Sequence, residues 1–227
     1  MFDLLYGVFM KAIVTGGSGF IGTNLIKNLK GRGWELLSID IEHPRNMDDF
    51  DVYYKCDILD KVSLVEVFNE FKPDYIFHLA ARTDLEGKAP SDYSVNTVGV
   101  ENVCQASYQL SPKIKLLAAS SMLVCKAGYI PNSIEDVCPN TVYGESKVVS
   151  ENILTSWKNK MPNIVIIRPT SIWGPWFSTP YKDFFDMVLA GRFFHIGNSS
   201  GTKTYGYVEN SVLQIISLAL AQTSHLK

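Results

Sequence analysis

Short apolar runs, each ended by glycine or polar residues, alternate along most of the chain with segments of helical spacing. The apolar runs predict strands over 11–15, 36–39, 52–55, 74–79, 114–120 and 164–167. The segments between them predict helices over 20–30, 62–71, 92–110 and 143–159. Several runs are apolar on both faces, as in strands covered by helices on two sides. The pattern therefore predicts an α/β fold, a Rossmann-type doubly wound parallel sheet.

The regular alternation ends near residue 171. Beyond it, glycine and proline interrupt the chain repeatedly, and a last apolar helix is expected over 212–221. We expect residues 11–170 to form the Rossmann domain and residues 171–227 to form a small, incomplete C-terminal substrate lobe. Residues 1–10 are expected to be an N-terminal extension, since Met10 followed by Lys11 resembles a natural start.

Composition excludes several classes of protein. Hydrophobic residues make up 46% of the 227 positions and charged residues 19%, which is enough apolar material for a core and excludes a disordered chain. The net charge of −2 offers no basic excess to bind nucleic-acid phosphates. The apolar runs are too short or too polar to span a membrane, and Asp3 replaces the positive charge of a signal peptide. We expect a soluble, cytoplasmic protein with no nucleic-acid or membrane partner.

The cysteines predict neither a metal site nor a disulfide scaffold. Cys56, Cys104, Cys125 and Cys138 are widely spaced, without a C-x-x-C pair or a nearby group of histidines. We expect four reduced, mostly buried thiols and no bound metal.

A glycine-rich turn joins the first predicted strand to the first predicted helix. Gly16, Gly19 and Gly22 are spaced as G-x-x-G-x-x-G. In such a turn the first glycine permits a tight bend, the second lets a pyrophosphate approach the backbone, and the third allows close helix–sheet packing. The helix N-terminus then faces the phosphates. The strand before the turn and the helix after it favour a dinucleotide site over an ordinary turn.

Asp40 ends the second predicted strand, eighteen residues beyond Gly22. A carboxylate at this position accepts hydrogen bonds from the adenosine ribose hydroxyls and repels a 2′-phosphate. Ile41 follows it, and Arg45 is the nearest basic residue in the loop. The position of Asp40 predicts NAD, and Arg45 is the one feature that favours NADP.

Tyr143 and Lys147 lie four residues apart on a predicted helix and therefore on the same face. A free phenol has a pKa of about 10. A nearby ammonium group, together with the positive charge of a bound nicotinamide, stabilises the phenolate, so the pair predicts a general base with a lowered pKa. Such a pair alone is common on helix surfaces, but its place after the fifth strand favours a catalytic role.

These motifs together resemble the extended short-chain dehydrogenases/reductases of the NAD-dependent epimerase/dehydratase family, over residues 11 to 220. The resemblance implies that the residues that contact the cofactor are Gly16, Gly19, Phe20, Ile21, Gly22, Asp40, Asp57, Ile58, Leu79, Ala80, Ala81, Asn96, Tyr143 and Lys147. For Asn96, a bond to a neighbouring backbone group is an equal alternative. His78, at the end of a buried strand, is expected to be structural.

The same resemblance implies that Ser121, Tyr143 and Lys147 form the reaction centre. Ser121 would hydrogen-bond the substrate oxygen that Tyr143 deprotonates, and Lys147 would bond the nicotinamide ribose. Dehydratases of the family carry an Asp-Glu pair directly after the catalytic serine or threonine, where this chain has Met122 and Leu123. This favours a nucleotide-sugar epimerase similar to UDP-glucose 4-epimerase. A nucleotide-sugar reductase or dehydrogenase and a weakly active NAD-binding regulatory protein are the alternatives.

The chain also departs from the family pattern. Cys125 and Lys126 follow Val124, where an aromatic residue is usual. Family members continue further and complete the substrate lobe, so we expect this chain to bind NAD and to turn over nucleotide sugars weakly. The resemblance further implies a homodimer, paired through the helices that carry Asn96 and Tyr143. The stretch from Val98 to Tyr108 and the face around Val148, Ile153 and Trp157 offer apolar residues for this contact.

Overall fold

Six parallel strands form the central sheet of the computed structural model, which describes residues 10–178, 181–194 and 204–221. The strands are β1 (Lys11–Thr15), β2 (Glu35–Asp40), β3 (Tyr53–Lys55), β4 (Tyr75–His78), β5 (Lys115–Ala119) and β6 (Ile164–Ile167). Their order is β3-β2-β1-β4-β5-β6, so the direction of winding reverses between β1 and β4. This confirms the predicted doubly wound fold and places a crevice at the reversal point.

The register of the strands brings the predicted motifs to one edge of the sheet. Thr15 at the end of β1 pairs with His78 at the end of β4, and Ala119 of β5 pairs with Ile167 of β6. Because all the strands are parallel, the segments that follow them leave the sheet at its carboxyl edge. The glycine turn and the segments after β4 and β5 are therefore neighbours in space.

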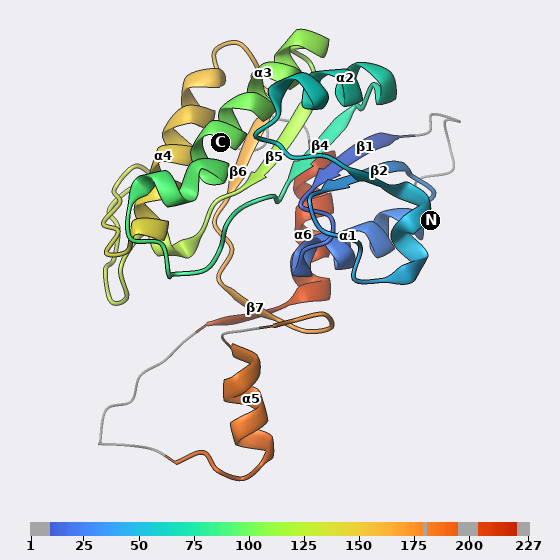
Figure 1. The fold of residues 1–227 in the computed structure, drawn as a ribbon. Helices are drawn as coiled ribbons and strands as arrows, with labels where there is room; N and C mark the ends of the chain where they lie inside the picture. The colour runs from blue at the N-terminus through green and yellow to red at the C-terminus, as the bar shows by residue number, and fades with distance from the viewer. Residues whose placement is uncertain (1–9, 179–180, 195–203, 222–227) are drawn as a thin grey trace.

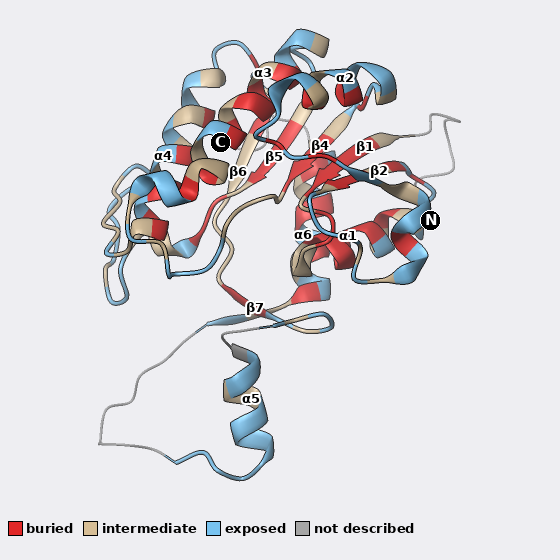
Figure 2. Cartoon of the chain, in the orientation of Figure 1, coloured by how far each residue is buried: buried red, intermediate tan, exposed pale blue. Residues whose placement is uncertain are grey.

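Helices cover both faces of the sheet (Figure 1). One face carries α2 (Lys61–Phe71), α3 (Val100–Leu110) and α4 (Val142–Trp157), and the other carries α1 (Phe20–Lys30) and α6 (Val208–Leu220). Successive side chains of β1 point to opposite faces of the sheet. Ile13 lies in the first core, between the sheet and α2, α3 and α4, and Val14 lies in the second core, between the sheet and α1 and α6. Figure 2 shows the sheet buried between these layers.

Side-chain caps fix where two of these helices begin. The Asp60 carboxylate accepts hydrogen bonds from the first turn of α2, and the Thr141 hydroxyl accepts one from the Gly144 N–H in α4. The helix predicted over 92–110 is divided into three parts. A 3₁₀ turn (Pro90–Tyr93) and a π-helical turn (Val95–Gly99) precede α3. Further 3₁₀ turns cover Met47–Val52 and Met122–Val124.

The remaining described elements lie below the sheet. β7 (Ser171–Trp173) and β8 (Tyr205–Tyr207) form a two-stranded parallel ribbon, and α5 (Tyr181–Leu189) extends away from it (Figure 1). We call these three elements the lower lobe. We expected the last apolar helix to belong to this lobe. Instead, α6 packs on the sheet beside α1, with Val212 and Ile216 in the second core. The boundary after residue 170 stays a prediction.

Parts of the sequence predictions concern residues that are not described. The expected N-terminal extension lies outside the described residues, apart from Met10. Within the described ranges, no helix has the length and hydropathy that a membrane span requires.

Candidate active site

A cleft of about 970 Å³ opens at the carboxyl edge of the sheet. All the site residues predicted from the sequence line it except Asn96. They are Gly16, Gly19, Phe20, Ile21, Gly22, Asp40, Asp57, Ile58, Leu79, Ala80, Ala81, Ser121, Tyr143 and Lys147. A smaller hollow of about 650 Å³ at the opposite edge of the sheet contains none of these residues. The cleft is therefore the candidate site.

The glycine turn is packed too tightly for side chains. Gly16 has a φ of +73°, and a Cβ added there would lie 2.5 Å from the Ala80 nitrogen. A Cβ on Gly22 would lie 2.3 Å from the Gly16 carbonyl oxygen. No side chain caps the first turn of α1, so its amino end is available to an anion in the cleft.

The Asp40 carboxylate is oriented by the backbone around it. Oδ2 accepts a hydrogen bond from the Ser18 N–H at 3.0 Å, and Oδ1 accepts one from the Glu42 N–H at 3.1 Å. Burial raises the pKa of Asp40, and these backbone hydrogen bonds oppose the rise. Each oxygen keeps a further lone pair, so the carboxylate can still accept hydrogen bonds from a ribose in the cleft.

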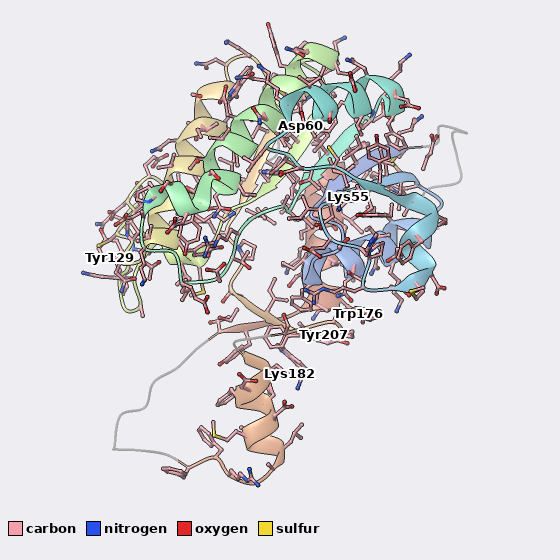
Figure 3. The ribbon with its side chains drawn as sticks, in the orientation of Figure 1. Lys55, Asp60, Tyr129, Trp176, Lys182 and Tyr207 are labelled. Carbon is pink, nitrogen blue, oxygen red and sulfur yellow. The ribbon has the colours of Figure 1, made fainter. Side chains whose placement is uncertain are left out.

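Arg45 holds two parts of the cleft wall together. Its Nε donates to the Ser18 carbonyl at 2.9 Å and its Nη1 to the Trp176 carbonyl at 2.7 Å. Asn24 supports the same contact by donating to the Pro175 carbonyl at 3.0 Å. Figure 3 shows Trp176 where the lower lobe meets the rest of the molecule. Arg45 thus joins the lobe to the glycine turn, and it also lines the cleft.

Ser121, Tyr143 and Lys147 meet at the far end of the cleft, and all three are buried. The Ser121 side chain hydrogen-bonds the Tyr143 phenol, and its Oγ also accepts from the Leu123 N–H at 3.1 Å. The Lys147 ammonium group donates to the Ala119 carbonyl at 3.0 Å. Burial lowers the pKa of Lys147 to about 8, opposed by the charge of Glu151.

The lowered pKa expected for Tyr143 depends on the nicotinamide charge as well as on Lys147, and Lys147 alone does not produce it. Burial raises the pKa of Tyr143, the Ser121 hydrogen bond opposes this, and Tyr93 adds to the rise. The neutral phenol is therefore favoured until another positive charge enters the cleft.

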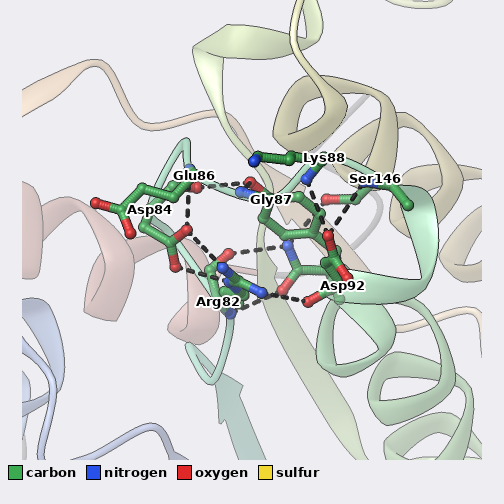
Figure 4. A network of polar contacts seen from close by, with 10 residues as sticks. Arg82, Asp84, Glu86, Gly87, Lys88, Asp92 and Ser146 are labelled. Carbon is green, nitrogen blue, oxygen red and sulfur yellow. Dashed lines mark hydrogen bonds and ion pairs between the residues drawn. The ribbon is translucent and has the colours of Figure 1, made fainter.

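Asn96 connects the segment after β4 to α4 through side-chain hydrogen bonds. Its Oδ1 accepts from the Arg82 N–H at 2.9 Å, and its Nδ2 donates to the Arg82 carbonyl at 3.0 Å and to Ser146 Oγ at 2.9 Å. Ser146 Oγ in turn donates to the Tyr143 carbonyl at 2.6 Å. Figure 4 shows Arg82 and Ser146 in the network of polar contacts that follows β4. These contacts match the backbone-bonding alternative, and a direct cofactor contact of Asn96 stays a prediction.

Tyr93 supports the site, and sequence analysis missed it. Its ring is fully buried and lies 6.0 Å from that of Tyr143, centroid to centroid. Its hydroxyl donates to the Asp84 carbonyl at 2.9 Å and accepts from the Gly87 N–H at 3.2 Å. The signal that could have found it is an aromatic residue three positions before Asn96.

His78 is structural, as expected. It is buried, and its Nδ1 lies 2.7 Å from Thr15 Oγ1. Burial lowers the pKa of His78 to about 3, with a smaller contribution from the charge of Lys147. The ring is therefore neutral and joins the ends of β1 and β4.

The cleft fits a dinucleotide. The glycine turn leaves room only for backbone, and Asp40 lies beside it with accepting oxygens. Deeper in the cleft, the buried Ser120 hydroxyl has no hydrogen-bond partner among the described residues. A bound polar group there would satisfy it.

Comparisons with known proteins agree with this geometry. Residues 12–223 match the family described as the NAD dependent epimerase/dehydratase family. Over 89% of its length, the chain is 30% identical to a UDP-glucose 4-epimerase of Mycolicibacterium smegmatis and to a 3-beta-hydroxysteroid dehydrogenase of Mycolicibacterium neoaurum. It spans 71% of the first relative and 58% of the second.

Solved structures share the fold. The UDP-glucose 4-epimerase of Thermotoga maritima superposes with a TM-score of 0.78 at 22% identity, covering 91% of this chain and 72% of its own. The Thermus thermophilus UDP-glucose 4-epimerase, solved in complex with NAD, superposes with the same TM-score and identity. The match covers 94% of this chain and 75% of the Thermus thermophilus chain. The chain belongs to the NAD-dependent epimerase/dehydratase family, and its cofactor is NAD.

Proposed function

We propose that the protein is an NAD-dependent nucleotide-sugar epimerase similar in activity to UDP-glucose 4-epimerase. The observation that carries this proposal is a buried group of Ser121, Tyr143 and Lys147 with no carboxylate directly after the serine. Met122 and Leu123 occupy those two positions in a 3₁₀ turn, and neither lines the cleft. Elimination of water from a keto sugar needs an acid and a base, whereas epimerisation needs neither beyond the Tyr143 site.

Each residue of the group has a distinct task. Bound NAD would supply the acceptor and donor of the hydride that epimerisation requires. Tyr143 takes the proton of the sugar hydroxyl, and Ser121 holds that oxygen through its hydroxyl. Lys147 places a positive charge at the base of the cleft and orients the ribose. Burial of all three excludes water, which strengthens their electrostatic interactions.

A net dehydrogenase is the second candidate. It uses the same three residues, and the similarity to a 3-beta-hydroxysteroid dehydrogenase equals that to the epimerase in percentage identity. Aromatic rings in the lower lobe suit an apolar substrate, with Trp173 lying 5.8 Å from Phe185 and 5.1 Å from Tyr207.

One screen separates these candidates. The protein is incubated with NAD and with UDP-, dTDP- and GDP-sugars, without added reductant, and the sugar products and NADH are both measured. Formation of an epimer without accumulation of NADH supports the proposal. Accumulation of NADH in proportion to product favours the dehydrogenase, and a dehydrated keto sugar contradicts the interpretation of Met122 and Leu123.

Asp40 is expected to set the preference for NADH over NADPH. Hydrogen bonds to a charged group contribute about 1.5–3 kcal/mol, so Asp40→Ala should weaken NADH binding by about 10- to 100-fold. NADPH binding should weaken less, because the variant also loses the repulsion of the 2′-phosphate. Calorimetric titrations of both cofactors measure this. Asp48→Ala, an acid of the same loop that does not line the cleft, is the control. Equal binding of both cofactors by the wild type would contradict the role of Asp40.

The homodimer also stays a proposal, with a direct test. Val98, Tyr108 and Val149 are exposed apolar residues on the two segments expected to pair. Ile153 and Trp157, which we also expected at the interface, pack partly against the core of their own chain. Val149→Asp should raise the dimer dissociation constant about tenfold or more, because it places a charge in the contact. Light scattering over a concentration series checks this, with Val62→Asp on α2 as an exposed control. A monomeric wild type would reject the dimer.

A further inference from the structure

Two cysteines are backbone pairing partners close in the sequence to the candidate active-site residues. Cys125 and Cys138 are partners in an isolated parallel β-bridge. The Cys138 N–H donates to the Val124 carbonyl at 2.9 Å, and the Cys138 carbonyl accepts from the Lys126 N–H at 2.8 Å. Strands paired in this way lie about 4.7–4.9 Å apart, with the side chains of paired residues on the same face. Disulfides span Cα separations of about 4.4–6.8 Å, so the backbone already has a suitable spacing.

The two thiols are accessible and lie in a common environment. Both are free and partly exposed. Cys125 Sγ lies 3.7 Å from the Asp136 carbonyl oxygen, in the loop that ends at Cys138. The Asp136 hydrogen bond and burial chiefly raise the pKa of Tyr129 to about 12, and the charges of Cys138 and Cys125 add to this. Tyr129 belongs to the same loop and lies at the edge of the molecule beside α4 (Figure 3).

The other two cysteines lack these properties. Cys56 and Cys104 are buried. Burial, the larger cause, raises the pKa of the Cys56 thiol to about 11 and that of the Cys104 thiol to about 12. Because the thiolate is the reactive form, neither reacts readily at neutral pH. Near the partly exposed pair, the Arg168 guanidinium donates to the Ile134 carbonyl at 2.7 Å.

The bridge joins the two segments that carry the reaction centre. Cys125 follows the 3₁₀ turn that begins directly after Ser121. Cys138 leads through Pro139 to Thr141, the N-cap of the helix that carries Tyr143. A covalent bond across the bridge would therefore connect the Ser121 segment to the Tyr143 segment, a few residues from each.

We propose that Cys125 and Cys138 form a reversible disulfide that connects the segments of Ser121 and Tyr143. The oxidant is a small-molecule disulfide such as glutathione disulfide. The thiolate of one cysteine attacks it, forming a mixed disulfide and releasing one small thiol. The thiolate of the second cysteine then attacks the mixed disulfide, forming the Cys125–Cys138 bond and releasing the second small thiol. The two protein thiols are oxidised as the small disulfide is reduced. This inference does not depend on the proposed epimerase activity.

The sequence makes the bond directly detectable. Trypsin cleaves after Lys115, Lys126 and Lys147, so the two cysteines fall on separate peptides, residues 116–126 and 127–147. The full chain is equilibrated with glutathione buffers of increasing oxidised fraction, its free thiols are alkylated, and it is digested without reductant. Mass spectrometry should find the two peptides linked, at the sum of their masses less two hydrogens. The linked species should disappear after reduction.

Two variants and the wild-type protein test the proposed disulfide in different ways. Cys138→Ser should abolish the linked peptides and leave Cys125 as a mixed disulfide with glutathione, whereas Cys104→Ser, at a buried thiol, should leave the link unchanged. The wild-type digest tests the proposal even if a variant fails to fold. Two alkylated thiols, or two separate glutathione adducts, in buffers that fully oxidise dithiothreitol would overturn the proposal.

Discussion

Replacing Tyr143 with Phe is expected to reduce turnover by about 10²- to 10⁴-fold, the usual contribution of a positioned general base. NADH binding should change by less than about twofold, because the cofactor side of the cleft is formed by the glycine turn and Asp40 at its other end. The variant removes the hydroxyl and keeps the ring.

The packing around Tyr143 makes this substitution specific. The ring is buried against that of Tyr93, and Phe preserves this contact. The hydroxyl is hydrogen-bonded to Ser121, which retains the Leu123 N–H as a second partner in the variant. The change therefore removes the proton acceptor with little disturbance of the core.

Turnover of the most active sugar nucleotide and calorimetric binding of NADH check both halves of this prediction. Tyr54→Phe, an exposed tyrosine on β3, is the matched control and should leave both unchanged. Turnover within tenfold of the wild type would exclude Tyr143 as the base. Loss of NADH binding would indicate that Tyr143 is needed for the structure of the cleft.

Much of the fold follows from local pattern. β1 and β6 begin and end where the apolar runs predict, and the other four strands differ by one residue at one or both ends. The helix predicted over 92–110 was wrong in detail, because apolar spacing does not distinguish α-helical from π-helical turns and Pro90 begins a separate 3₁₀ turn. The placement of α6 was wrong because an apolar face shows that a helix is buried, and not which layer covers it.

The lining of the cleft could also be predicted from local sequence patterns, whereas its long-range contacts could not. Its lining follows from motifs at strand ends, which parallel strands bring to one edge. The hydrogen bond from Arg45 to the Trp176 carbonyl joins residues 131 positions apart, and no local sequence pattern predicts it. The effect of burial on the Tyr143 pKa could not be predicted either, because spacing on a helix brings Lys147 near Tyr143 but gives no measure of burial.

Replacing Gly16 with Ala is expected to destabilise the protein by about 2–5 kcal/mol. Two causes add. The residue has a φ of +73°, and left-handed backbone costs an alanine about 1–2 kcal/mol. The new Cβ would also lie 2.5 Å from the Ala80 nitrogen and 2.7 Å from the Leu79 carbonyl carbon. Overpacking of this kind adds about 1–3 kcal/mol, because backbone atoms cannot move aside as a flexible side chain does.

Gly33→Ala separates the two causes. Gly33 has nearly the same backbone conformation, with a φ of +75°, but no atom lies within 4 Å of its added Cβ. Gly33→Ala should therefore show only the backbone strain, about 1–2 kcal/mol. Urea unfolding of both variants measures the difference, which should be about 1–3 kcal/mol. NADH binding should weaken in Gly16→Ala alone, since the displaced segment after β4 lines the cleft. Equal destabilisation by the two variants would show that the close approach of Gly16 to Ala80 contributes nothing, and that the glycine is needed only for its backbone conformation.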